Sequence, residues 1–202
     1  MEMKDYFAVY ENQLSPEVCR DIITRFEADS RKVKGMVGRG DKGVVDPSVK
    51  ATTELLLWTS REGWEDVNDA LLSSLKACLA EYMTSFGPAF PIALAPEEPR
   101  ITRYKAGEGF LQWHSDNIGR SPTRVLTAIW YLNTVKRGGE THYPWQDIAI
   151  APVEGRLVLC PVGWPFMHRG NPPVGGPKYI LITQLHQEVR KPVASAHQRA
   201  EA

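Results

Sequence analysis

A histidine and an aspartate stand two positions apart in the segment Trp113-His114-Ser115-Asp116. Residues i and i+2 of an extended chain point to the same side, so the imidazole of His114 and the carboxylate of Asp116 could hold one metal ion together. Taken alone the pattern is weak, because a surface ion pair between the same two side chains explains it equally well. A metal site needs a further ligand.

His168 is a candidate for that third ligand, downstream of an apolar segment and just before Gly170. Two histidines and one carboxylate on one triangular face of an octahedral ion leave three positions open, which is typical of non-haem Fe(II) oxygenases. A closed structural zinc site would need four protein ligands instead. An iron with open positions needs a co-substrate to supply electrons. A 2-oxo acid such as 2-oxoglutarate can chelate two of the positions and leave the third for dioxygen.

Lys178 begins a segment that is otherwise rich in Ile, Leu and Thr, from Tyr179 to Leu185. A lysine in this place either protects the edge of a sheet or is a buried charge that requires a partner. In the second case it could meet the distal carboxylate of 2-oxoglutarate.

The sequence resembles the prolyl 4-hydroxylase type of Fe(II)- and 2-oxoglutarate-dependent dioxygenases over roughly residues 100–187. The resemblance depends on a series of motifs in order, each of which is weak alone. They are Arg103-Tyr104-x-x-Gly107, His114-x-Asp116, Arg124-x-x-Thr127, Tyr131-Leu132-Asn133, Gly138-Gly139-Glu140-Thr141 with Pro144, Pro152-x-x-Gly155, His168-x-Gly170, Pro173-Val174 and Gly176-x-Lys178.

This resemblance implies an α+β fold with a double-stranded β-helix (jelly-roll) core, and an enzyme that uses Fe(II), 2-oxoglutarate and O2, with ascorbate as a stimulant. It implies hydroxylation of an unactivated C–H bond, in a prolyl residue of a peptide or protein, with succinate and CO2 as co-products. The carboxylate of Asp116 favours hydroxylation over halogenation. The implied iron ligands are His114, Asp116 and His168; the implied co-substrate residues are Lys178, Tyr104 and Thr141.

Aromatic and basic residues flank these motifs and could line a peptide groove or clamp a small acid. For Trp145 and Trp164, packing in the core or at a rim is an equal alternative. Two other functions stay open: a hydroxylase of a free amino acid or other small molecule, which a closed, charged pocket would favour, and a non-catalytic jelly roll that binds a ligand or metal. The substrate candidates are Trp113, Arg120, Arg124, Trp145, Trp164 and Arg169.

The elements that must position these residues differ between the two halves of the chain. From Arg100 onward, β-branched and aromatic residues form short runs separated by Gly and Pro, which favours a sandwich or jelly roll over a parallel sheet. Within one of these runs, alternation turns Thr141 and Tyr143 inward and His142 outward. His186 and His197 are expected at the surface. The expected strands cover residues 101–104, 125–132, 141–143, 148–150, 157–160 and 179–185.

The first half of the chain is expected to be helical and to buttress the jelly roll. Ser15 and Pro16 form a helix start, followed by Val18, Ile22 and Phe26 on one face. A second helix is predicted from about Trp64 to Phe86. Residues 31–58 are polar and rich in Gly, and we expect them to fold over the substrate as a lid. One domain of residues 1–190 results, with helical support and lid in 1–99, the metal-binding jelly roll in 100–190, and a polar tail at 191–202.

Composition excludes several classes of protein. Equal numbers of basic and acidic residues, 24 of each, give no field that would hold a polyanion, so no nucleic-acid partner is expected. No segment has the ~18 consecutive apolar residues of a membrane span or the apolar core of a secretory signal, so a cytoplasmic protein is expected. Cys19, Cys78 and Cys160 are expected as reduced core thiols. The composition leaves monomer and homodimer open.

Overall fold

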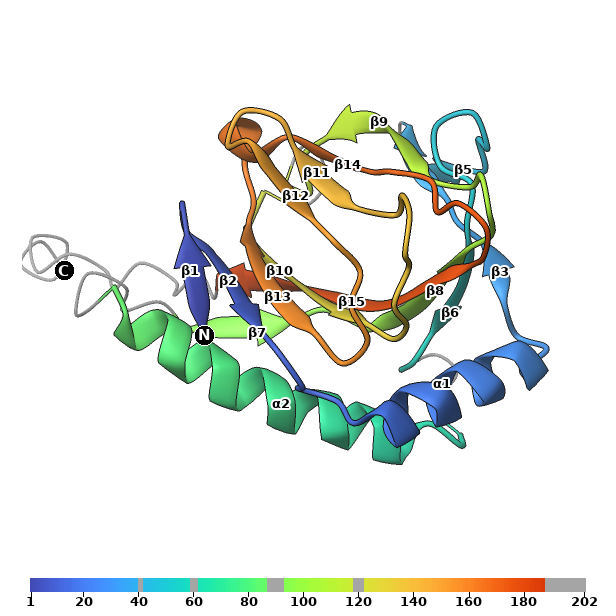
Figure 1. The fold of residues 1–202 in the computed structure, drawn as a ribbon, viewed down its shortest axis with the longest axis horizontal. Helices are drawn as coiled ribbons and strands as arrows, with labels where there is room; N and C mark the ends of the chain where they lie inside the picture. Colours follow the sequence, from blue (N-terminus) through green and yellow to red (C-terminus); the bar gives the residue numbers. More distant parts are fainter. Residues whose placement is uncertain (40–41, 59–61, 87–92, 118–121, 188–202) are drawn as a thin grey trace, which may run out of the picture.

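The computed structural model describes residues 1–39, 42–58, 62–86, 93–117 and 122–187. Two antiparallel sheets of nine and four strands face each other, and two helices cover the outer face of the larger sheet (Figure 1). This arrangement confirms the predicted α+β jelly roll with helical support. The predicted tail at 191–202, together with His197, lies outside the described residues.

The larger sheet takes strands from both halves of the chain. Its hydrogen-bonded order is β1 (Glu2–Lys4), β2 (Phe7–Tyr10), β13 (Leu157–Pro161), β10 (Arg124–Tyr131), β15 (Lys178–Gln187), β8 (Arg100–Tyr104), β6 (Thr53–Leu56) and β3 (Val33–Lys34), and β7 (Leu94–Pro96) pairs with β15.

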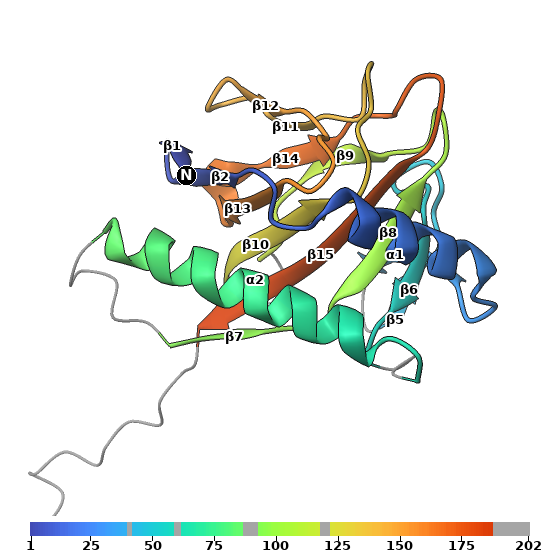
Figure 2. The same cartoon turned by 60° about the horizontal axis from the view of Figure 1, so that its bottom comes forward.

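The smaller sheet lies across the larger one and comes entirely from the second half of the chain (Figure 2). Its order is β12 (Ile148–Ile150), β11 (Thr141–Tyr143), β14 (His168–Gly170) and β9 (Phe110–His114). A separate hairpin pairs β4 (Val37–Arg39) with β5 (Lys42–Val44).

Strand β10 illustrates how alternation divides the interior into two layers. Leu126, Ala128 and Trp130 belong to the cluster that includes the helices. Ile129 and Tyr131, on the opposite face, belong to the cluster between the two sheets. The helix-facing layer holds the fold together, while the layer between the sheets includes residues that line the site described below.

Helix α1 (Pro16–Ala28) begins as the sequence predicts: the Ser15 hydroxyl accepts a hydrogen bond from the backbone of Val18, and Pro16 occupies the first turn. Its buried face differs from the prediction, because Val18 is exposed and Cys19 takes its place beside Ile22 and Phe26. Helix α2 (Glu65–Thr84) confirms the second predicted helix. The three cysteines are free and buried, as expected. Neither described helix is apolar enough over its length to cross a membrane.

The expectation of a helical first half is wrong in part, because β1, β2, β3 and β6 join the larger sheet. The expected lid at 31–58 is also wrong in part: Leu55 and Leu57 are buried in the core. Just before them, the backbone of Ala51 donates to Gly109, and Leu111 donates to Val49. Residues 49–56 therefore pass from the edge strand of the smaller sheet, β9, into strand β6 of the larger one, closing one side of the space between the sheets.

Candidate metal centre and co-substrate pocket

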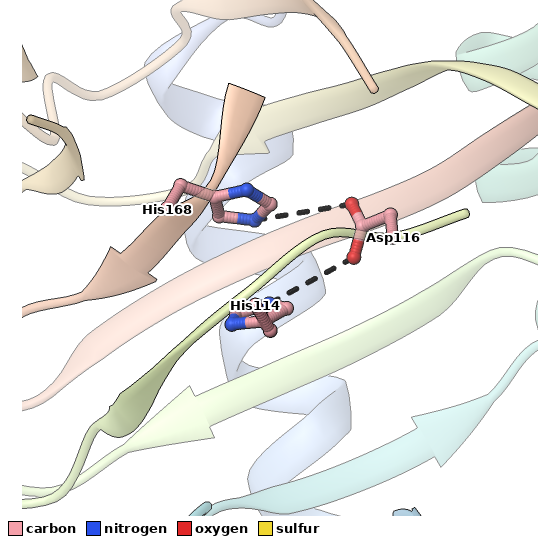
Figure 3. A group of neighbouring side chains, drawn as sticks. All are labelled: His114, Asp116 and His168. Carbon is pink, nitrogen blue, oxygen red and sulfur yellow. Dashed lines mark ion pairs between the residues drawn. The ribbon is translucent and has the colours of Figure 1, made fainter. Parts of the chain in front are cut away.

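His114, Asp116 and His168 point toward one another, and their nearest ligand atoms all lie within 4.8 Å of one another (Figure 3). The strand pairing explains the histidines, because His168 of β14 lies directly opposite His114 of β9, and opposed residues share a face. The carboxylate of Asp116 lies 3.8 Å from His114 Nε2 and 3.9 Å from His168 Nε2. The residues that the sequence singled out as ligands are thus brought to one place.

Backbone carbonyls orient both imidazoles. His114 Nδ1 lies 3.0 Å from the carbonyl oxygen of Gln112, and His168 Nδ1 lies 3.2 Å from that of Phe166. A carbonyl oxygen only accepts hydrogen bonds, so each Nδ1 must carry the proton. In the neutral ring this tautomer leaves the lone pair on Nε2, which faces Asp116, as a metal-binding histidine needs.

Burial also favours a neutral ring at His114, since it lowers the pKa of this imidazole to about 4. For Asp116, by contrast, the surroundings favour the charged form. Burial raises its pKa, but His168, His114, the Thr127 hydroxyl and Arg100 together outweigh that effect and bring the pKa to about 2. At neutral pH the cluster therefore offers neutral nitrogen from His114 and an ionised carboxylate.

A second layer of contacts fixes Asp116. Its Oδ2 accepts a hydrogen bond of 2.6 Å from the Thr127 hydroxyl, and its backbone carbonyl accepts one of 2.9 Å from Arg124. Arg124 itself forms a two-pronged ion pair with Glu97. Arg124, a substrate candidate from the sequence, is therefore held as a support for Asp116. Glu97 also pairs with His186, which is partly buried and not at the surface as expected.

Lys178 is buried and lies in the same pocket, on the larger sheet. Its ammonium group donates to the carbonyl oxygen of Gly139 at 2.9 Å and lies 4.3 Å from the ring centre of Tyr104. Burial lowers the pKa of Lys178 to about 7, although Glu140 acts in the opposite direction. Of the two readings of this lysine, the structure favours the buried charge over the sheet-edge residue.

Thr141 and Tyr104 also line this pocket, where the resemblance places co-substrate ligands. The Thr141 side chain faces inward and shares a hydrogen bond of 2.8 Å with the Tyr131 hydroxyl, a buried group that the sequence did not single out for a role. His142 points away from the site, as alternation predicted, and packs against Trp113.

Four further polar residues line the pocket and were missed from the sequence: Lys50, Glu54, Arg100 and Thr102. Lys50 and Glu54 are both buried and form an ion pair of 2.5 Å. The signal was the alternation of polar residues at 50, 52 and 54 and again at 100, 102 and 104. This alternation indicates side chains that face a pocket only if residues 49–56 are taken to be extended chain rather than a lid.

Those substrate candidates that the structure describes do not gather around the pocket. Trp113 and Arg169 neighbour His114 and His168 on their strands, so alternation turns them to the outer face of the smaller sheet, where the Arg169 guanidinium lies 4.5 Å from the Trp113 ring. This corrects the expectation that they line the substrate space. Trp145 and Trp164 are 64% and 75% exposed, which contradicts core packing. Arg120 lies outside the described residues.

Comparison with known proteins identifies the domain that carries these residues. Residues 99–186 match the model of the 2OG-Fe(II) oxygenase superfamily, and this range contains the His-Asp-His cluster and Lys178. Residues 99–186 belong to the 2OG-Fe(II) oxygenase superfamily. The match identifies the protein as a 2-oxoglutarate-dependent dioxygenase. It confirms the expected cofactor Fe(II) and the expected co-substrates 2-oxoglutarate and O2. The search of curated proteins found no match.

Solved structures of prolyl hydroxylases share the fold of this oxygenase. The viral collagen prolyl hydroxylase of Paramecium Bursaria Chlorella virus-1, in complex with 2OG, is 19% identical, with a TM-score of 0.66 over 92% of this chain and 97% of that one. A Trichoplax adhaerens prolyl hydroxylase, in complex with a hypoxia inducible factor peptide, is 18% identical, with a TM-score of 0.70 over 90% and 84%. A Pseudomonas putida prolyl-4-hydroxylase is 15% identical, with a TM-score of 0.59 over 89% and 92%.

The side chains of the oxygenase fit the cofactor and co-substrate of its superfamily. Two oriented nitrogen ligands and one carboxylate suit Fe(II) and leave positions open. Within the described residues, Lys178 has no carboxylate at ion-pair distance, so its charge is buried without an anion. A dicarboxylate that reaches from the metal cluster to Lys178 would supply that anion.

Proposed function

We propose that this dioxygenase hydroxylates an unactivated C–H bond, in a prolyl residue of a peptide or protein, and forms succinate and CO2. The observation that carries the proposal is the pocket itself, in which the His-Asp-His cluster and the buried Lys178 line one space. The solved prolyl hydroxylases, one of them in complex with a peptide, support the choice of substrate.

In this mechanism His114, Asp116 and His168 would hold Fe(II), and Lys178 would pair with the distal carboxylate of 2-oxoglutarate. Iron and co-substrate supply the oxidising chemistry when bound: one oxygen atom of O2 ends in succinate, as 2-oxoglutarate loses CO2, and the other ends in the new hydroxyl group. The protein's part is to orient and to exclude water.

Several residues perform that work. Thr127 and Arg124 fix Asp116, and the ring of Phe110 stacks on His114 at 3.6 Å between centroids. Ile129, Ile180 and Ile182 line the pocket with apolar side chains, which suits the methylene groups of co-substrate and substrate and disfavours stray water.

A free amino acid or other small molecule is the second candidate substrate, and one observation favours it. The pocket is lined by the charged residues Lys50, Glu54 and Arg100 in addition to the cluster and Lys178, while Trp145 and Trp164 are exposed and do not line it. The third alternative, a non-catalytic jelly roll, would call for a lost ligand or a lost co-substrate cation.

A substrate screen by mass spectrometry tests the proposed function. Peptides that contain proline and free amino acids are incubated with the protein, Fe(II), 2-oxoglutarate and air. We expect a gain of one oxygen atom in a substrate, matched by an equal amount of succinate, and stimulation by ascorbate. Succinate without any oxidised product in either series would count against both substrate classes.

The cytoplasmic location and the oligomeric state stay predictions. Fractionation of the source cells tests the first, and sizing of the purified chain tests the second.

A further inference from the structure

Arg100 places a guanidinium on the wall of the metal pocket. Along β8, Arg100, Thr102 and Tyr104 alternate and line the pocket together. Strand pairing sets Arg100 opposite Ile182 and Leu56, so both of its cross-strand neighbours are apolar. A cation in this position is unusual for a half-buried apolar row and requires a reason.

The described residues leave Arg100 with few partners. Its side chain donates one hydrogen bond of 3.3 Å to the neutral amide oxygen of Gln184, and no described carboxylate lies at ion-pair distance from it. A guanidinium has five N–H donors. Thr102 is the next residue on the same face of β8. Its buried hydroxyl has no hydrogen-bond partner within the described chain. Two adjacent polar groups on this wall therefore have donors to spare: Arg100 uses only one of its N–H groups, and the Thr102 hydroxyl has no partner.

The other charges in the pocket are already matched. Lys50 and Glu54 neutralise each other through their ion pair. Lys178 is assigned to the distal carboxylate of 2-oxoglutarate, and Asp116 to the metal. With both bound, Fe(II), Asp116, the co-substrate dianion and Lys178 are together neutral. Arg100, which interacts electrostatically with Glu54 and Asp116, is then the surplus positive charge among the described residues that line the pocket.

We propose that Arg100 binds a carboxylate of the substrate, and that the substrate is therefore a small carboxylic acid of the amino-acid type. A guanidinium meets a carboxylate through two parallel hydrogen bonds, which would also fix the orientation of the substrate beside the metal cluster. The unpartnered Thr102 hydroxyl supplies a further donor on the same wall. The inference rests on the proposed hydroxylase function and decides between its two candidate substrate classes in favour of the free acid.

The test compares acids with their amides, because an amide keeps the shape and removes the charge. Protein loaded anaerobically with Fe(II) and 2-oxoglutarate is titrated with a panel of free L-amino acids and the corresponding amides, and with a peptide that ends in proline as the free acid and as the amide. We expect at least one free acid to bind, and its amide to bind at least ~100-fold more weakly. The peptide pair shows whether the carboxylate that Arg100 binds can belong to the end of a peptide or must belong to a free amino acid.

Arg100→Gln and Arg100→Met should remove the preference for the acid by weakening acid binding ~100-fold while amide binding stays unchanged. The Kd of 2-oxoglutarate, measured in the same preparations, reports whether the variants fold and keep the co-substrate site. Arg20→Gln, on the exposed surface of α1, is the matched control and should keep the preference.

Equal binding of acid and amide, no binding of any free acid, or an equal loss for acid and amide in Arg100→Gln would each overturn the proposal. These results leave the hydroxylase function standing wherever 2-oxoglutarate still binds and succinate still forms. Failure of 2-oxoglutarate to bind the wild-type protein would instead overturn the proposed function, and this inference with it.

Discussion

At the scale of single residues, the candidate metal site depends on how its ligands are held. Gln112 and Phe166 set the tautomers of the two histidines through their carbonyl oxygens, and Thr127 donates to Asp116. Partners of this kind orient ligands, and their loss typically weakens metal binding or activity by ~10–100-fold.

Thr127→Val keeps the shape of the side chain and removes the hydroxyl. We expect Fe(II) affinity to fall by about 10-fold or more, because Asp116 loses the bond that orients it. Anaerobic metal titration measures the change, and Thr127→Ser, which retains the hydroxyl, should restore most of the affinity. Unaltered iron affinity in Thr127→Val would mean that this hydrogen bond is incidental.

Lys178 gives the site a dependence on pH. In the free pocket burial lowers its pKa to about 7, and a bound carboxylate would raise that pKa again. Binding of 2-oxoglutarate therefore takes up a proton above about pH 7. Affinity should be constant below that pH and fall as the pH rises beyond it, by at most about tenfold per pH unit.

Calorimetry in buffers of different ionisation enthalpy measures both the affinity and the proton uptake. Tyr104 lines the same pocket, and Tyr131 is hydrogen-bonded to Thr141, which also lines it. Burial raises the pKa of both tyrosines, so neither should titrate in this range. Lys178→Met should bind 2-oxoglutarate more weakly and without this proton uptake. A wild-type affinity that is flat between about pH 6 and pH 9 would refute the assignment of Lys178.

At the scale of elements, residues 49–56 join the two sheets and carry the Lys50–Glu54 pair. Gly35 packs over that pair: a Cβ atom at this position would lie 1.9 Å from the Thr52 hydroxyl and 2.9 Å from Glu54 Oε1. Because real Cβ contacts are never this short, a side chain at position 35 must displace the side chains of Thr52 and Glu54 or the segment that carries residue 35.

Gly35→Ala should therefore destabilise the protein, by roughly 1–3 kcal/mol as is usual for overpacking. Gly38→Ala is the matched control, since its Cβ would meet nothing within 4 Å. Chemical denaturation compares the two variants. Equal stability of both variants would show that residues 33–35 can move without loss of stability, and that close packing of Gly35 over the Lys50–Glu54 pair is not required.

The sequence predicted those parts of the site whose signals are local. His114 and Asp116 stand two positions apart at the end of β9, and the second histidine and the lysine follow in a fixed order along the chain. Arg100 and Glu54 gave no comparable signal, because their place in the pocket depends on the pairing of β6 with β8. The same limit explains the errors in the first half of the chain, where short strands owe their structure to partners far away in sequence.

At the scale of the whole molecule, the site needs both sheets. The smaller sheet supplies His114 and His168, and the larger sheet supplies Lys178 and Arg100, with Asp116 following β9. The two helices stabilise the larger sheet from its outer face and leave the space between the sheets to the site (Figure 2). Binding of Fe(II) together with 2-oxoglutarate therefore requires the two sheets to be correctly placed, as well as the single residues that hold them.

The most direct test of the central claim is anaerobic addition of Fe(II) and 2-oxoglutarate, followed by visible absorption. We predict a weak charge-transfer band in the wild-type protein and in His142→Ala, whose histidine points away from the site, and no band in His114→Ala or His168→Ala. Absence of the band from the wild-type protein, or its persistence in His114→Ala, would contradict the assignment of these residues to an iron centre that binds 2-oxoglutarate.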